Sequence, residues 1–109
     1  MSLLVLVLGN KTQAADIYTA QATAYCLTGQ TATGTYTRAN HTVASKREWF
    51  GKVMILYEDT GDHRIHPENY IGTYVVEDTG GEPIQMGWVI DVYIPGYKEE
   101  NMDSYIGIR

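Results

Sequence analysis

Short apolar segments separated by polar or glycine-rich stretches run along the chain, and they predict strands rather than helices. Ile17 to Cys26 alternates small and aromatic side chains, the period of a strand with one buried face. Lys52 to Tyr57 is a compact apolar run, and Gly87 to Ile94 is another that ends at a Pro-Gly pair. Further strands are expected at 42–45, at 71–77 and from residue 105, the last preceded by one or two helical turns at 98–104. Strands spaced about ten residues apart and joined by glycine turns predict a small all-β barrel.

Both ends of the chain raise separate questions. Leu3 to Leu8 is a continuous apolar run, too short for a membrane span, which needs about 20 residues. Polar residues and then Ala14 and Ala15 follow, as at the end of a truncated signal peptide cleaved after Ala14, although no basic residue precedes the run. We therefore expect a possible signal segment at 1–15 and one domain at 16–109; the alternative is a buried first strand. Because the chain stops at Arg109, where a closing strand is expected, a missing last strand and an exposed edge are also expected.

Composition and charge narrow the function. The 109 residues suffice for one domain, and the 44% apolar and 19% charged residues are typical of a globular protein. The net charge is −5, and the densest basic spot, Lys46-Arg47, is followed at once by Glu48. Nucleic acid is therefore not expected as a partner, because such binding depends on a basic surface. The single cysteine, Cys26, allows no internal disulfide and is expected to be a small buried side chain.

Two aspartates are the strongest candidates for chemistry. Asp78 leads into a Thr-Gly-Gly turn directly after an apolar strand, and glycines let a backbone approach a ligand closely. Asp91 lies inside the apolar segment Trp-Val-Ile-Asp-Val-Tyr-Ile, where an ionised carboxylate is costly without a partner. A buried carboxyl has a raised pKa, which suits a general acid. The alternative is that Asp91 only caps a barrel turn or accepts backbone hydrogen bonds.

Other side chains give weaker signals. His63 and His66 are three residues apart, but they lie in a polar loop without an evident third ligand, so no metal site is expected. Thr79 has no base placed by the sequence to activate it as a nucleophile. The tyrosines, Trp49 and Trp88 are expected to pack in the core or at its rim more often than to stack on sugars.

An ordered series of short motifs resembles a known family. The series is Ala-Thr-Ala-Tyr-Cys at 22–26, Thr-Ala-Thr-Gly at 31–34, Thr-Val-Ala at 42–44, Gly-Lys-Val at 51–53, Glu-Asp-Thr-Gly-Gly at 77–81 and Ile-Asp-Val-Tyr at 90–93. It resembles the 3D domain, named for three aspartates, which occurs in membrane-bound lytic transglycosylase A and in small secreted murein hydrolases. The resemblance covers about residues 20–109.

This resemblance implies a six-stranded double-psi β-barrel that cleaves peptidoglycan glycan strands without a cofactor. Asp91 takes the family's catalytic acid position and Asp78 the supporting one. Thr31, Thr33, Gly80 and Gly81 are then expected to line the groove, and Tyr25 and Glu48 to contact the substrate. The chain departs from the family after Val43-Ala44, where an aspartate is usual and Glu48 is the nearest substitute. The interval from Asp78 to Asp91 is also about two residues longer than in the family.

The expected function is that of a lytic transglycosylase, secreted or in the cell envelope, with no membrane span in the mature chain and a monomer or weak dimer as its state. The expected reaction cleaves the β-1,4 bond between N-acetylmuramic acid and N-acetylglucosamine and forms a 1,6-anhydro product. A non-catalytic glycan-binding module is the alternative, favoured by the absent third aspartate. A structural or phage-associated fragment is a further alternative, raised by the two chain ends.

Overall fold

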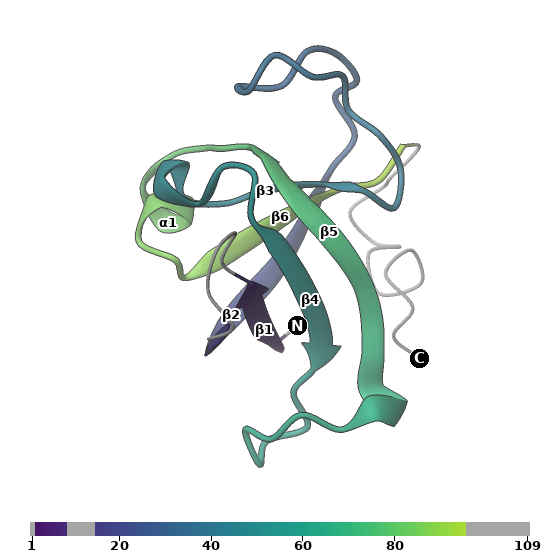
Figure 1. The fold of residues 1–109 in the computed structure, drawn as a ribbon, viewed down its shortest axis with the longest axis vertical. Helices are drawn as coiled ribbons and strands as arrows, with labels where there is room; N and C mark the ends of the chain where they lie inside the picture. Colours follow the sequence, from purple (N-terminus) through teal and green to yellow (C-terminus); the bar gives the residue numbers. More distant parts are fainter. Residues whose placement is uncertain (1, 9–14, 96–109) are drawn as a thin grey trace.

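The computed structural model describes residues 2–8 and 15–95, which are dominated by six strands (Figure 1). The strands are β1 (Ser2–Leu8), β2 (Ala15–Tyr25), β3 (Thr42–Ala44), β4 (Val53–Glu58), β5 (Tyr70–Asp78) and β6 (Val89–Tyr93). Three single-turn helices join them: η1 (Arg47–Trp49), η2 (Pro67–Asn69) and α1 (Glu82–Gln85). The helix and strand expected at 98–104 and from residue 105 lie outside the described residues.

The strands close into one mixed barrel in the order β1-β2-β6-β3-β5-β4. Two of the pairs, β2 with β6 and β3 with β5, are parallel, and the others are antiparallel. The expectation of a small, six-stranded all-β barrel is therefore confirmed. The expected open edge is absent among the described strands, because β1 pairs with both β2 and β4 and closes the barrel.

The apolar run at the start of the chain is the strand that completes this closure. Leu3, Val5 and Val7 join the hydrophobic core, and Leu4 is buried as well. Burying a Leu or Val side chain stabilises a fold by about 1.5–3 kcal/mol. In the structure these residues are thus a buried first strand, the alternative to a signal segment that the sequence left open.

Strand alternation divides the barrel into an inner and an outer face. Ala20 and Ala22 of β2 and Ile90 and Val92 of β6 point into the core. Successive side chains of a strand point to opposite faces, so Asp91 points to the outer face. The charge within an apolar strand is thereby explained: its apolar neighbours face the core and the aspartate does not.

Two long connections project from opposite ends of the barrel (Figure 1). Residues 26–41 link β2 to β3 at one end, and residues 59–69 link β4 to β5 at the other. Cys26 is exposed and unpaired, which corrects the expectation that it is buried. It follows the last residue of β2 and therefore belongs to the connection rather than to the inner face.

Candidate functional site

An irregularity in β5 places Asp78 on the same face as Asp91. In the parallel pair of β3 and β5, Val43 lies opposite Val76, but Ala44 lies opposite Asp78, so that Glu77 is an extra residue. Val76 points into the core, and strict alternation would send Asp78 inward as well. A bulge of this kind turns the following side chain to the other face, and bulges are common beside active sites.

Ala44 is the residue that joins the two aspartates. It lies opposite Asp78 on one neighbouring strand and opposite Asp91 on the other. Its methyl group is small and buried, which leaves space above it for the two carboxyl groups. Three strands therefore bring together two residues that are thirteen positions apart in the sequence.

A cavity of about 480 Å³ opens over this part of the barrel. Its volume lies in the range of small-molecule sites, about 300–1,000 Å³. Its lining comes from the end of β2, the 26–41 connection and the three strands beneath: Tyr25, Leu27, Thr28, Gly29, Gln30, Thr37, Ala44, Asp78, Thr79 and Asp91. None of these lining residues carries a positive charge, so the cavity is acidic.

Asp91 is half-buried, and among the described residues its side chain has one hydrogen-bond partner, the hydroxyl of Thr23. Thr23 lies directly beside it on β2, and its Oγ1 donates to Asp91 Oδ1 at 2.9 Å. Burial raises the pKa of Asp91, the Thr23 hydrogen bond opposes that rise, and the negative charge of Asp78 adds to it. The net direction is upward, as a proton donor requires.

Asp78 is held by several donors. Its Oδ1 accepts from the backbone N–H groups of Thr79 at 3.0 Å and Ala32 at 3.1 Å. Its Oδ2 accepts from the hydroxyl of Tyr25 at 3.2 Å. The carboxylate thus fixes the 26–41 connection against the end of β5 and has a defined orientation in the cavity.

Tyr25 belongs to the same polar arrangement. Burial raises the pKa of its phenol, and the neighbouring Asp78 raises it further, so Tyr25 remains a hydrogen-bond donor. Its ring contacts Tyr93 edge to face, with centroids 5.5 Å apart. The hydroxyl of Tyr93 in turn shares a 2.6 Å hydrogen bond with Thr28. These contacts order the wall of the cavity.

The predicted site residues divide into two groups. Asp78, Asp91 and Tyr25 come together in the cavity lining, and the other five are placed elsewhere: Thr31, Thr33, Gly80, Gly81 and Glu48. Thr31 is buried and shares hydrogen bonds with the Thr33 and Thr35 hydroxyls within the connection. Glu48 lies exposed on η1, 3.7 Å from the ammonium group of Lys46.

The Thr-Gly-Gly turn has an evident structural role. A Cβ on Gly80 would lie 2.5 Å from Cδ1 of Ile84, so a larger residue there would displace the end of the Ile84 side chain, by which α1 packs on the turn. The Thr79 hydroxyl donates to the Ser45 carbonyl and accepts from the Gln85 amide, which also donates to the Gly80 carbonyl. Gly81 precedes the first residue of α1 and is exposed. These contacts hold Thr79 in place as a wall of the cavity.

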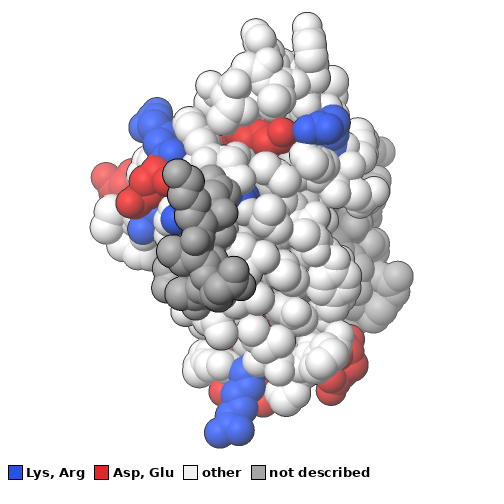
Figure 2. Space-filling model, in the orientation of Figure 1, with Lys and Arg blue, Asp and Glu red and all other residues white. Residues whose placement is uncertain are grey.

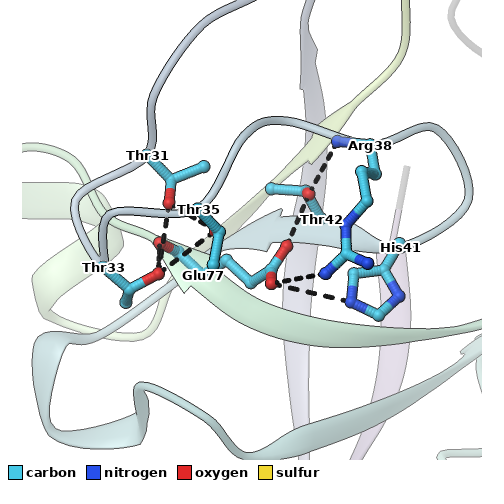
Figure 3. A network of polar contacts seen from close by, with 7 residues as sticks. All are labelled: Thr31, Thr33, Thr35, Arg38, His41, Thr42 and Glu77. Atoms are coloured by element: carbon cyan, nitrogen blue, oxygen red, sulfur yellow. Dashed lines mark hydrogen bonds and ion pairs between the residues drawn. The ribbon is translucent and has the colours of Figure 1, made fainter.

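Glu77 is the residue that the sequence analysis missed (Figure 3). It is only 6% exposed, yet it carries three polar partners: the Thr42 hydroxyl at 2.8 Å, Arg38 at 3.0 Å and His41 at 3.6 Å. Burial opposes ionisation of Glu77, but the hydrogen bonds from Thr42 and Arg38 outweigh it and lower the pKa. The carbonyl of Glu77 also accepts from Thr33. In the sequence, the only sign of this site was a glutamate directly before Asp78. Strict alternation would put Glu77 and Asp78 on opposite faces of β5, and the register shift in β5 places them on the same face.

The histidines of the 59–69 connection form local pairs. His63 Nδ1 lies 2.7 Å from Asp59, and His66 Nε2 lies 2.6 Å from Asp62. Within residues 2–8 and 15–95, no three His, Cys, Asp or Glu side chains are grouped so as to hold a metal ion. Trp49 packs on Tyr18, with ring centroids 5.2 Å apart, whereas Trp88 is mostly exposed.

The described surface carries scattered charge. On the face drawn in Figure 2, Lys and Arg occur as separate side chains rather than as a continuous patch. The part of the chain that the structure describes includes no helix long and apolar enough to cross a membrane. Comparisons with protein-family models, curated proteins and solved structures found no match to this chain.

Proposed function

We propose that this protein is a murein lytic transglycosylase that uses Asp91 as general acid and then general base. The observation that carries the proposal is the placement of two carboxyl groups of different environment in one open cavity. Asp91 has a raised pKa and Asp78 is held by three donors. The resemblance of the motif series to the 3D domain supplies the substrate class, peptidoglycan glycan strands.

The reaction needs only one proton-transferring group. Asp91 donates its proton to the oxygen that leaves between N-acetylmuramic acid and N-acetylglucosamine. The resulting carboxylate then removes the proton from the C6 hydroxyl of the muramic ring. That oxygen attacks C1, forms the 1,6-anhydro ring and returns Asp91 to its protonated state. Two carboxylates flank the bond in ordinary glycosidases, whereas here Asp78 stabilises positive charge on the transition state.

The test is product analysis on purified murein sacculi. Wild-type protein is expected to release anhydro-muropeptides, detected by mass spectrometry. Asp91→Asn should lower the initial rate by about 10²–10⁴-fold, the range of general acid–base catalysis. Asp62→Asn, in the exposed connection at the other end of the barrel, is the matched control and should keep the wild-type rate. Equal product from wild type and Asp91→Asn would refute the role of Asp91.

A non-catalytic glycan-binding module is the second candidate. This candidate is supported by the position of Glu48, the nearest substitute for the family's third aspartate. The cavity is lined by two carboxylates, Asp78 and Asp91, and Glu48 lies on the exposed η1 instead of beside them. Sacculus binding in a pull-down, with no anhydro product from wild type, would favour this candidate over the enzyme.

A further inference from the structure

Thr23 is the only described side chain that donates a hydrogen bond to Asp91, and neither the motif series nor the strand pattern gave it a role. The two residues are opposite each other in the parallel pair of β2 and β6. The Thr23 hydroxyl points at Oδ1 of Asp91, 2.9 Å away. A β-branched side chain such as threonine has few rotamers, so this donor is held in position.

The hydrogen bond makes the two oxygens of Asp91 unequal. In a neutral carboxylic acid one oxygen carries the proton and donates, and the other is the carbonyl oxygen and the better acceptor. A donor fixed on Oδ1 therefore favours Oδ1 as the carbonyl oxygen. We propose that Thr23 is a positioning residue that keeps the transferable proton of Asp91 on Oδ2. This inference rests on the proposed function for its meaning in catalysis.

The hydrogen bond from Thr23 also affects a measurable quantity, the pKa of Asp91. The polar and ionisable groups that face it are Thr23 and Tyr25 from β2 and Asp78 from β5, with the methyl group of Ala44 from β3 between the aspartates. None of these groups is a cation. The Thr23 hydroxyl is therefore what opposes the rise in the pKa of Asp91 caused by burial and by Asp78.

The direct test is a carboxyl titration of the folded protein by ¹³C NMR. The Asp91 signal is assigned by its loss in Asp91→Asn. In Thr23→Val, which keeps the branched shape and removes the hydroxyl, the Asp91 midpoint should move to higher pH. Thr23→Ser restores the hydroxyl and should return the midpoint towards the wild-type value. Thr19→Val, on the same face of β2 and outside the aspartate cavity, should leave the midpoint unchanged.

The activity assay adds a second readout. In Thr23→Val the limb of the pH–rate profile that reports loss of the Asp91 proton should move to higher pH, and kcat should fall several-fold with little change in KM. A Thr23→Val protein in which Asp91 titrates as in wild type would overturn the proposal. Absence of product from wild type would refute the transglycosylase instead, while the NMR titration would still decide whether Thr23 controls the proton on Asp91.

Discussion

Glu77 and Asp91 both lie on the outer face of the barrel, but their surroundings affect their charge in opposite ways. Glu77 is almost fully buried and has a lowered pKa, because Thr42 and Arg38 stabilise its ionised form. Asp91 is more exposed and has a raised pKa, because partial burial and the charge of Asp78 disfavour its ionised form and its one described donor, Thr23, only partly opposes them. The less buried carboxyl group is thus the one that more readily keeps its proton.

The difference shows that partners, rather than burial alone, decide the ionisation of a carboxyl group here. A cation and hydrogen-bond donors around Glu77 make it an anchor for residues 38–42 at the return of the long connection (Figure 3). Around Asp91 there are instead a neutral donor and a second aspartate, and its pKa is raised. Asp78, between these two regions, contributes to both because it holds Ala32 of the connection and lines the cavity.

The largest expected difference between the two regions is in activity. Asp78→Asn should reduce the rate of anhydro-muropeptide release by about 100-fold, as expected for loss of an electrostatic group that acts on the transition state. Glu77→Gln keeps the shape of its side chain and lies outside the cavity lining, so its rate should stay within about tenfold of wild type. The assay uses sacculi and equal amounts of folded protein. A larger loss of rate in Glu77→Gln than in Asp78→Asn would contradict the assignment of Glu77 to structure and of Asp78 to the reaction.

The next largest effect is on the free energy of unfolding, and it should be larger for a substitution of Glu77 than for one of the exposed Glu48. Glu77→Ala removes a buried acceptor and leaves Thr42 and Arg38 without their partner, at a cost of about 2 kcal/mol in the free energy of unfolding. Glu48→Ala is the control, because Glu48 is exposed, and its change should stay within about 0.5 kcal/mol. Urea unfolding of both variants measures the difference. Equal midpoints would show that the Glu77 cluster does not anchor the fold.

The pH dependence of stability should have opposite signs for the two carboxyl groups. The folded pKa of Glu77 lies below its ordinary value of 4.5, so its stabilisation is present above that value and is lost as pH falls through the folded pKa. The folded pKa of Asp91 lies above 3.8, so its contribution is present below that value and is lost as pH rises through the folded pKa. Glu77→Gln should therefore weaken the acid-induced loss of stability, and Asp91→Asn should steepen it. Parallel pH profiles for the two variants would contradict the comparison.

The smallest expected effect tests the tyrosine that donates a hydrogen bond to Asp78. Tyr25→Phe removes the donor to Asp78 but keeps the ring that packs on Tyr93, so we expect a loss of about 1 kcal/mol in unfolding free energy. Tyr36→Phe is the control, since the Tyr36 ring is 71% exposed and its change should be within about 0.5 kcal/mol. Thermal or urea unfolding serves for both. Identical losses would mean that the Tyr25 hydroxyl adds no stability through Asp78.

The sequence by itself determined the class of fold and most of its strands. Alternation predicted β2, and compact apolar runs predicted β4 and β6, because these signals arise from residues near one another in the chain. It also pointed to Asp78 and Asp91, because a carboxylate inside or beside an apolar strand is costly and therefore conspicuous. The apolar run of β1 was visible too, but a short run does not by itself distinguish a signal segment from a strand buried on both faces.

Only the tertiary structure decided which of these residues meet. Closure by β1 depends on pairing with β2 and with the distant β4, and local pattern carries no information on such partners. The orientation of Asp78 depends on one extra residue in β5, which reverses the face that alternation would predict. Glu77 is itself that extra residue, and the pairing of β5 with β3 brings it to Thr42, while the parallel register of β2 and β6 places Thr23 beside Asp91. The aspartate cavity is therefore a product of strand pairing, which sets distances between residues that the linear sequence leaves apart.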